Sequence, residues 1–509
     1  MQGWTWAMLA TMAGGAATLP LAEARGQVTA AAAQWGRQGE GCVVPTGRAR
    51  PWADRGQSPA CRARFALDQF RSPAEKLRFL DPSAKPDGAV RDVAKLLGLP
   101  ATGGASDGPA GVVRATGATA FGSPLGVAAS FDPQVATRYG TLLGQEFRAA
   151  GFGTMLGPAL DTARSWRFGR LSESFGEDPF LTGRIATAEI RAIQAQHVLV
   201  TMKHYAAYAQ EAGRVGDQPS GARPSVNNMV SERALREIYL PGFEAAVREG
   251  GAGAVMCSFP RVNGVYACEN PHLFDILKRE WGFDGSVGPD FPSAQRSITR
   301  ATLAGLDAGA FGATPFNAGL KDEKTLAQAI ADGEVPEARL DDLVLRRLIP
   351  AFRVGLHDDP RPRAGADIWN AEHRAAAAEM VTAGSVLLKN AGDILPFGPG
   401  VRRIAVIGAQ ATAQATVVEQ GSPYVKPAHL APALPAIADR AGGKAKVTFA
   451  AGTRGLGPLP APVAGLFRTA AGLPGFTADF VANPCMDFSA APLGTRVVDR
   501  PYLDRKSVV

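Results

Sequence analysis

Four side chains that can take part in chemistry stand just after strand-like or turn segments of this sequence: Asp107, Lys203, His204 and Asp290. A carboxylate can act as a nucleophile, whereas an ammonium group or an imidazole can donate hydrogen bonds to a polar ligand. In barrels built of alternating strands and helices, active sites lie at the carboxyl ends of the strands. We therefore predict that these residues line one pocket for a small polar ligand.

A long polar stretch, residues 157–184, stands close to this chemistry: GPALDTARSWRFGRLSESFGEDPFLTGR. It follows a short apolar run at 152–156 and precedes a helical pattern. Its glycines, prolines, aromatic residues, acids and arginines alternate too irregularly for a helix. Because barrel enzymes carry binding groups on long loops that follow buried strands, we predict that this polar loop helps to form the pocket.

The elements that must position these residues alternate between two patterns from about residue 65 to 355. Apolar runs typical of strands lie at 153–157, 198–202, 254–258 and 286–287. Helical patterns lie at 133–149, 182–196, 231–249 and 271–281. Such alternation predicts parallel strands, in either a (β/α) barrel or an open doubly wound sheet. The position of the polar residues after the strands favours the barrel.

The polar loop closely resembles the signature loop of glycoside hydrolase family 3, the β-glucosidase and β-xylosidase group. Residues 202–211 and 255–290 resemble the same family, and the likeness covers about residues 65–450. The resemblance implies an α/β fold: a (β/α) TIM-like barrel, then an incomplete α/β sandwich domain with the start of a β-rich insertion. It also implies a retaining, exo-acting β-glycosidase that hydrolyses terminal non-reducing β-D-glucosyl or β-D-xylosyl residues of oligosaccharides.

The resemblance assigns roles to individual residues. In the segment EWGFDGSVGPDF, residues 280–291, it implies that Asp290 is the nucleophile, which forms a covalent glycosyl-enzyme intermediate. His204 then holds the ligand and need not be a general base. The residues that it assigns to substrate binding are Asp107, Arg170, Lys203, His204, Met256 and Phe291.

The polar loop contains other arginines besides Arg170. We expect Arg164 and Arg167 to brace the loop by pairing with its acids, a structural role that is also the plain alternative for Arg170. The acids available for this bracing are Glu173, Glu177 and Asp178.

The surroundings of Asp290 depart from the family pattern. Pro289 stands where a serine is usual, and Phe291 replaces a tryptophan or tyrosine, although it can still stack on a sugar face. Phe259 stands where many members have a tyrosine. Because that hydroxyl would hydrogen-bond the charged carboxylate, we expect its loss to raise the pKa of Asp290.

The proton donor is the main gap. In the family it is a glutamate of the second domain, reached after any carbohydrate-binding insertion, and we expect it to be absent from this chain. Glu419 is the weak candidate that remains. Because residues 504–509, DRKSVV, match what a common sequencing adapter encodes when translated, we expect the chain to be a C-terminally truncated fragment.

The domain boundaries follow from these patterns. We expect a signal peptide, which predicts a periplasmic or secreted protein with no membrane attachment after cleavage, then a barrel, a linker, an incomplete sandwich domain and the start of a protective-antigen-type carbohydrate-binding insertion. The corresponding ranges are 1–24, 65–355, 356–383, 384–458 and 470–503, with 504–509 as the adapter artefact.

Composition narrows the remaining functions. The 509 residues carry a formal net charge of +7, but the basic residues are not clustered, so we expect no nucleic-acid partner. The six histidines and five cysteines show no metal-ligand spacing, and no metal or cofactor is implied. In an oxidising compartment Cys42 could pair with Cys61 and Cys257 with Cys268, which would leave Cys485 over.

Several alternatives stay open. Without a proton donor, the chain could be a non-catalytic sugar-binding protein or an inactive fragment. The family's β-N-acetylglucosaminidase branch is less favoured, because its histidine-bearing loop after the KH pair is replaced here by AAYAQEAGR, residues 206–214. A nucleotide-dependent enzyme is disfavoured, since Gly408 after a strand is not followed by a GxGxxG loop. The expected partner is a small oligosaccharide or glycoside.

Overall fold

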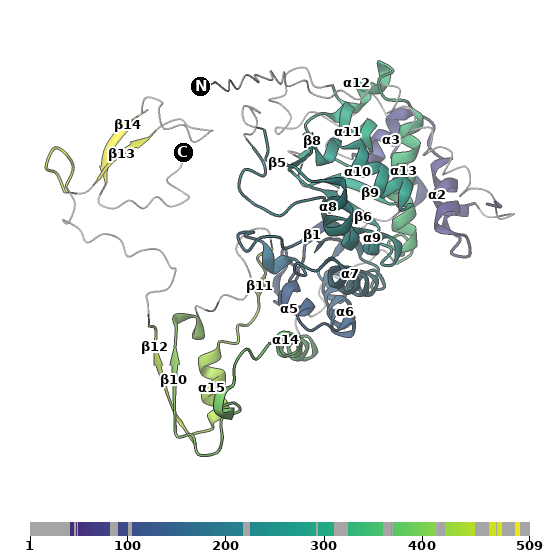
Figure 1. Cartoon of the computed structure of the whole chain (residues 1–509). Coiled ribbons are helices and arrows are strands. Elements are labelled where there is room, and N and C mark those ends of the chain that lie inside the picture. The colour runs from purple at the N-terminus through teal and green to yellow at the C-terminus, as the bar shows by residue number, and fades with distance from the viewer. Residues whose placement is uncertain are drawn as a thin grey trace, which may run out of the picture. The chain divides into compact units, whose positions relative to one another are not determined.

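The structure is a computed structural model (Figure 1). It describes residues 41–44, 47, 49–81, 90–99, 104–216, 224–291, 294–309, 324–359, 368, 370–413, 415, 423–452, 468–474, 476–480 and 494–498. The chain divides into unit 1, which comprises Met1–Val386 and Val418–Ala428, and unit 2, which comprises Leu387–Val417 and His429–Val509. The predicted signal peptide, Glu419, Cys485 and residues 504–509 lie outside the described residues.

Unit 1 is organised around a sheet of five parallel strands. Their order is β1 (Gly104–Asp107), β3 (Phe152–Ala159), β4 (Leu199–Tyr205), β6 (Ala254–Cys257) and β9 (Ser286–Pro289). Each strand pairs in parallel with the next, and helices between the strands lie alongside the sheet (Figure 1). The predicted α/β class with a barrel-type parallel sheet is therefore confirmed.

Two long helices pack on this sheet at the places that the sequence predicts. Helix α6 (Pro133–Ala149) has the predicted bounds, and α7 (Pro179–Gln194) begins three residues before its predicted start. Both begin with a proline, whose missing N–H costs no hydrogen bond in a first turn. The Asp178 carboxylate accepts hydrogen bonds from the N–H groups of Phe180 and Leu181 and so caps α7.

The helices predicted at 231–249 and 271–281 are each interrupted. The first consists of α8 (Glu232–Ala234), the π-helical turn η3 (Leu235–Tyr239) and α9 (Pro241–Arg248). The second consists of α10 (Pro271–Asp275) and the π-helical turn η5 (Ile276–Glu280). Pro241 has no N–H to donate to the preceding turn, so the regular hydrogen bonding restarts at that residue.

The remaining elements of unit 1 are short except for α13 and α14. They are η1 (Pro51–Ala53), α2 (Pro59–Leu67), α3 (Pro73–Leu80), α4 (Val93–Leu97), β2 (Thr116–Ala118), α5 (Pro124–Ala128), η2 (Leu171–Glu173), β5 (Asn227–Asn228), β7 (Arg261–Val262), β8 (Val265–Tyr266), η4 (Ala267–Glu269), α11 (Ile298–Ala304), α12 (Leu326–Ala331), α13 (Ala338–Arg353), α14 (Ala371–Gly384) and β11 (Lys426–Pro427).

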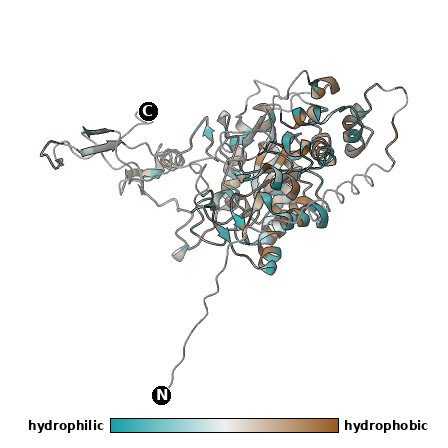
Figure 2. Cartoon of the chain, turned by 90° about the horizontal axis from the view of Figure 1, so that it is seen from above, coloured by the Kyte–Doolittle hydropathy of each residue, from teal (hydrophilic) through white to brown (hydrophobic). Residues whose placement is uncertain are grey.

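Two large apolar cores and a small third cluster around Val354 stabilise the described part of unit 1, and hydrophobic residues gather on its packed elements (Figure 2). The larger core lies between the central sheet and its helices, and the smaller one lies among α2, α3, α4 and α13. The disulfide Cys42–Cys61 ties α2 to the segment before it, and Cys257–Cys268 ties β6 to η4. Both cysteine pairings considered from the sequence are thus present.

Two segments expected in the linker and in the second domain belong to unit 1. Helix α14 packs on α5 and α6, and His373 Nδ1 lies 2.7 Å from the buried Glu146 Oε1. Strand β11 pairs in parallel with β2, and Val425 beside it is fully buried in the larger core. The compact units therefore divide the chain differently from the predicted ranges 356–383 and 384–458.

Unit 2 contains two parallel strands, β10 (Arg403–Ile407) and β12 (Lys446–Ala450), with helix α15 (Ala433–Ala441). It also has the single turns η7 (Ala391–Asp393) and η8 (Ala409–Ala411), and the antiparallel pair β13 (Phe476–Phe480) and β14 (Gly494–Val498). Apolar side chains of unit 2 such as Leu388 and Ile407 are exposed.

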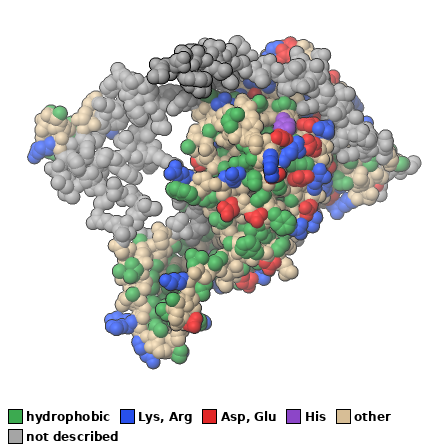
Figure 3. Space-filling model, viewed as in Figure 1, with side chains coloured by type: hydrophobic (Ala, Val, Ile, Leu, Met, Phe, Trp, Pro, Cys, Tyr) green, Lys and Arg blue, Asp and Glu red, His purple; other side chains and the backbone are tan. Residues whose placement is uncertain are grey.

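On the visible face of unit 1, acidic and basic side chains are interspersed (Figure 3).

Candidate active site

The predicted residues lie at the carboxyl ends of neighbouring parallel strands. Asp107 is the last residue of β1, and Asp290 directly follows β9. Lys203 and His204 lie within β4, close to its end at Tyr205, rather than after the strand as predicted. Because these ends meet at one edge of the sheet, residues far apart in the sequence come within hydrogen-bonding distance.

Lys203 and Asp107 form the first contact of the site. Lys203 Nζ lies 2.8 Å from Asp107 Oδ1. The lysine side chain is 2% exposed and the aspartate side chain 20% exposed, so the carboxylate borders the opening. The pair compensates the cost of burying the ammonium group. The second Asp107 oxygen, Oδ2, accepts no hydrogen bond from the described residues.

His204 is held by a carboxylate that the sequence analysis did not single out. Asp161, two residues after β3, accepts a hydrogen bond from His204 N at 3.2 Å and lies 2.7 Å from Nδ1. On the other side of the ring, Arg170 Nη1 lies 3.3 Å from Nε2. Because guanidinium only donates, Nε2 must accept and Nδ1 must carry the proton. Burial, together with Arg170 and Lys203, lowers the pKa of His204 well below its usual value, so the ring is neutral.

Arg170 links this histidine to the polar loop. Its Nε and Nη2 lie 2.6 and 2.8 Å from the two oxygens of the buried Glu173. The expected pairing of Arg164 and Arg167 with Glu173, Glu177 or Asp178 is not found among the described residues. Instead, the Arg164 guanidinium lies 5.7 Å from the centre of the Tyr239 ring, and that of Arg167 lies 5.0 Å from the centre of the Trp166 ring. Arg170 itself combines the bracing role with a contact to His204.

Asp290 is buried in a positively charged environment. Its Oδ2 lies 3.6 Å from His204 Nε2, and its carboxylate accepts no hydrogen bond from the described residues. Burial raises the pKa of Asp290 to about 6, against the opposing effect of Lys203, Arg214 and Arg170. The direction agrees with the sequence expectation, but the main cause is burial and not the hydroxyl missing at Phe259.

The two apolar residues assigned to substrate binding differ in exposure. Met256, in β6, is buried and lies outside the apolar cores that contain its neighbours Val255 and Cys257, so it faces the opposite side of the sheet. Phe291 follows Asp290 with a positive φ of 57° and is 63% exposed. An exposed aromatic ring beside the carboxylate leaves a face free for stacking on a ligand.

A second set of residues that sequence reasoning missed follows β4. The rings of His204 and Tyr208 are 5.0 Å apart, and the Tyr208 hydroxyl donates to Glu211. Arg214 Nη1 donates to the Tyr208 oxygen at 2.9 Å, and its guanidinium lies 5.2 Å from the Phe259 ring. Glu211 and Arg214 line a surface hollow of about 550 Å³. The sequence offered one signal for these residues, because the charged residues Glu211 and Arg214 follow closely after Lys203 and His204.

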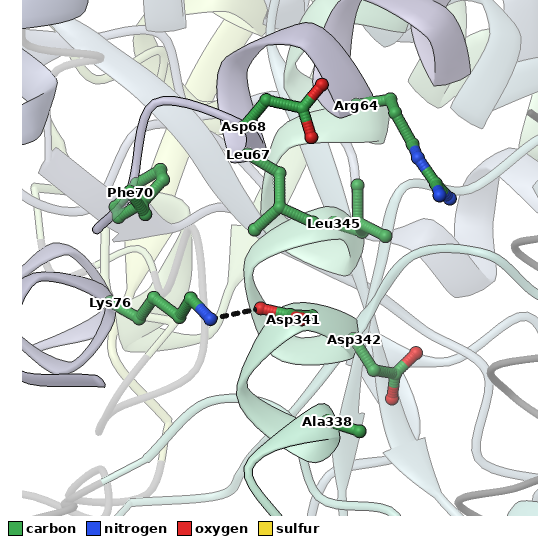
Figure 4. Close-up of a pocket in the computed structure, with 9 residues that line it drawn as sticks. All are labelled: Arg64, Leu67, Asp68, Phe70, Lys76, Ala338, Asp341, Asp342 and Leu345. Atoms are coloured by element: carbon green, nitrogen blue, oxygen red, sulfur yellow. Dashed lines mark ion pairs between the residues drawn. The ribbon is translucent and has the colours of Figure 1, made fainter. Parts of the chain in front are cut away.

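Another hollow, of about 490 Å³, lies among α2, α3 and α13 (Figure 4). Among its charged lining residues, Lys76 and Asp341 form an ion pair, with Lys76 Nζ 2.6 Å from Asp341 Oδ1. None of the predicted site residues lines it.

Within the described ranges, no group of three or more histidine, cysteine or acidic side chains is arranged to hold a metal ion. The helices of those ranges include none long and apolar enough to span a bilayer.

Comparison with known proteins places this chain in a family of glycosyl hydrolases. Residues 89–349 match the model of the glycosyl hydrolase family 3 N-terminal domain. The chain is 34% identical over 338 residues to thermostable β-glucosidase B of Acetivibrio thermocellus, covering 66% of this chain and 42% of that protein. It is 35% identical over 325 residues to a β-glucosidase of Rhizobium radiobacter, covering 62% and 38%.

Solved structures of β-glucosidases are also similar to this chain. The β-glucosidase DesR of Streptomyces venezuelae, in complex with D-glucose, is similar with a TM-score of 0.65 and 32% identity, covering 76% of this chain and 50% of that one. The β-glucosidase D2-BGL of Chaetomella raphigera is similar with a TM-score of 0.66 and 26% identity, covering 80% and 58%. The chain thus spans about two fifths of the length of the two curated relatives named above.

Proposed function

Because this chain belongs to glycoside hydrolase family 3, we propose that it is a retaining β-glycosidase with Asp290 as its nucleophile. Its substrates are terminal non-reducing β-D-glucosyl or β-D-xylosyl residues of small glycosides. The observation that supports this proposal is a buried carboxylate that accepts no hydrogen bond from the described residues and lies near Lys203, His204 and Arg170 at the carboxyl ends of parallel strands. Hydrogen-bond donors around a carboxylate suit a sugar whose hydroxyls surround its reactive carbon.

The covalent step follows from this geometry. An oxygen of ionised Asp290 attacks the anomeric carbon, a carbon–oxygen bond forms, and the bond to the leaving oxygen breaks. The cations around Asp290 favour its charged form, so the carboxylate is ionised above pH about 6. Asp107, Lys203, His204 and Arg170 hold the sugar, and Met256 and Phe291 supply its apolar contacts. Water then releases the sugar with its configuration retained.

The proton for the leaving oxygen comes from outside this cluster. His204 is neutral, and its one ring proton, on Nδ1, faces Asp161, so Nε2 has no proton to give. Asp161 and Glu173 are occupied by His204 and Arg170. We propose that the donor is a second-domain glutamate, as the family resemblance implies. A substrate with an acidic leaving group does not require that proton.

An activated substrate therefore tests the nucleophile directly. We would measure 2,4-dinitrophenyl β-glucoside turnover with azide as the acceptor, in the unaltered chain, Asp290→Ala and Asp275→Ala. Asp275 is a surface residue paired with Arg279 and serves as the matched control. We expect β-glucosyl azide from the unaltered chain and the control, but none from Asp290→Ala.

The other outcomes separate the alternatives. Glucose binding with no azide product from the unaltered chain would favour a non-catalytic sugar-binding protein. Turnover of an N-acetylglucosaminide but not of a glucoside would instead favour the family's other branch.

We further propose that the protein works outside the cytoplasm, in the periplasm or as a secreted protein. The disulfides Cys42–Cys61 and Cys257–Cys268 support this, because disulfides persist in oxidising compartments. Titration of free thiols in the purified, unreduced chain should find only the thiol of Cys485. Thiols from all five cysteines would contradict the proposal.

A further inference from the structure

Asp290 follows a strand with an unpaired edge. Strand β9 is the last of the five described strands, and its inner edge pairs with β6. The pairing continues to the nucleophile, because the Asp290 N–H donates to Cys257 O at 3.0 Å. No described strand pairs with the outer edge. Backbone groups at such an edge need other partners, and those partners help to fix the strand.

Asp307 supplies these partners. Its Oδ2 accepts a hydrogen bond from the Val287 N–H at 2.9 Å. The N–H groups of Asp307 and Ala308 donate to Val287 O at 2.8 and 2.9 Å. Both outward backbone groups of Val287 are therefore satisfied. The next outward position is Pro289, which has no N–H, so the residue that departs from the family pattern costs no hydrogen bond here.

The Asp307 carboxylate is itself held on its other oxygen. Lys278 Nζ lies 2.7 Å and Arg339 Nη2 2.8 Å from Oδ1. Arg339 also donates to the carbonyl oxygens of Thr302 and Leu306, both at 3.0 Å. Asp307 is 0% exposed. Removing one partner of such a buried pair is costly, so the carboxylate has little freedom to move away from β9.

We propose that Asp307 is a positioning residue that sets the place of Asp290 through β9. This inference rests on the proposed function of Asp290 as the nucleophile. Asp307 holds the outer edge of the strand three residues before the nucleophile, while β6 holds the inner edge. A shift of the strand moves the attacking oxygen relative to the bound sugar, and a misplacement of about 1 Å can cost about 10²-fold in rate.

The same cluster contains a matched control, Asp342. It is also buried, and it pairs with Arg339 and with Arg346, whose Nε lies 2.9 Å from Asp342 Oδ1. Whereas Asp307 lies against β9, Asp342 lines the hollow among α2, α3 and α13 (Figure 4). Removing either carboxylate disturbs the ion cluster, but only Asp307 bonds the Val287 backbone.

The test compares Asp307→Ala, Asp307→Asn and Asp342→Ala in the full chain. The rate of covalent labelling by an activated 2-deoxy-2-fluoro-β-glucoside is followed by intact mass, glucose affinity by calorimetry, and hydrogen exchange by mass spectrometry of peptides containing 284–291. We expect Asp307→Ala to label at least about 10-fold more slowly, with faster exchange in this peptide and glucose affinity within about 3-fold. Asp307→Asn, which keeps an acceptor for Val287, should recover most of the rate.

The control and the outcomes are distinct. Asp342→Ala should lower the melting temperature but leave the labelling rate within about 3-fold. Equal labelling rates in Asp307→Ala and Asp342→Ala would overturn the inference. If Asp307→Ala does not fold, Asp307→Leu, which also lacks an acceptor for Val287, replaces it, and exchange in that variant no faster than in Asp342→Leu would overturn the inference as well. Absence of labelling in the unaltered chain would instead overturn the proposed nucleophile, while the exchange comparison would still test how β9 is held.

Discussion

Two buried clusters of charged residues lie near β9, and they use similar residue types for different ends. The site cluster comprises Asp107, Asp161, Arg170, Lys203, His204 and Asp290, and the clamp cluster comprises Lys278, Asp307, Arg339, Asp342 and Arg346. In the clamp cluster, both oxygens of Asp307 are bonded within the protein. In the site cluster, Asp290 accepts no hydrogen bond from the described residues, and Asp107 borders the opening.

The difference indicates how a buried charge serves structure or binding. A carboxylate whose lone pairs are all occupied by protein donors can only hold those donors in place. A carboxylate that is buried without such donors keeps its acceptor capacity for a ligand, at a cost in stability. Residue type alone does not separate the two cases, whereas the count of satisfied atoms does.

The largest effect is expected from removing the Asp290 carboxylate, which accepts no hydrogen bond from the described residues. Asp290→Ala should lower activated-glucoside turnover by about 10³-fold or more, because the proposed attacking oxygen is lost and Asp107 remains paired with Lys203. Its melting temperature should not fall, since a buried charge without protein hydrogen bonds is lost. Initial rates and thermal unfolding measure the two effects. A variant that loses activity only because it unfolds would contradict the assignment.

Glu189 is a buried carboxyl group outside both clusters, so it tests separately what an unpartnered carboxyl group costs in stability. Neither of its oxygens has a hydrogen-bond partner in the described structure, and burial raises its pKa to about 8. The folded state then binds more protons than the unfolded state between pH about 4.5 and 8. The free energy of unfolding should therefore fall as pH rises through this window and level off above it.

The variant Glu189→Gln removes this titration. Relative to the unaltered chain, it should abolish a loss of about 2–3 kcal/mol between pH 5 and pH 7. Urea unfolding at the two pH values measures the difference. Glu244→Gln, at an exposed position in α9, is the control. Parallel pH dependences in the unaltered chain and Glu189→Gln would show that this carboxyl is ionised or hydrated in the folded protein.

Arg170 connects the site cluster to the polar loop. Its loss should therefore weaken sugar binding as well as loosen the structure of the loop. Arg170→Ala removes the donor to His204 Nε2 and leaves Glu173 unpaired. We expect KM for the activated glucoside to rise about 10- to 30-fold. Arg167→Ala, on the same loop, removes only a contact with the Trp166 ring and should change KM by less than about 3-fold. Equal effects of the two changes would argue against a binding role for Arg170.

The smallest expected effect is a pH dependence. With the pKa of Asp290 raised to about 6, the carboxylate is largely protonated at pH 5 and largely ionised at pH 7. The rate of labelling by the activated fluoroglucoside should rise about 10-fold across this range, because only the ionised form attacks. A profile that is flat from pH 5 upward would mean that the surrounding cations outweigh burial.

The sequence by itself determined the family, the parallel α/β architecture and the strand-end positions of Asp107, Lys203, His204 and Asp290. The architecture could be predicted because hydrophobic periodicity is a local property of the sequence. The family and the site positions could be predicted because the motifs that carry them are short and continuous. The two cysteine pairings were also accessible, because each joins cysteines that are close in the sequence, 19 and 11 residues apart. The roles of the individual site residues remain predictions that the proposed experiments test.

Only the tertiary structure decided which charges meet. Asp161 and Arg170, both on the polar loop, meet the two ring nitrogens of His204 in β4, a contact that the irregular composition of the loop does not encode. The holding of β9 by Asp307 and the docking of Val425 bring together residues distant in the chain, as the folded core requires. Partner choice and burial depend on long-range packing, so the raised pKa of Asp290 has its main cause in the fold and not in the missing hydroxyl.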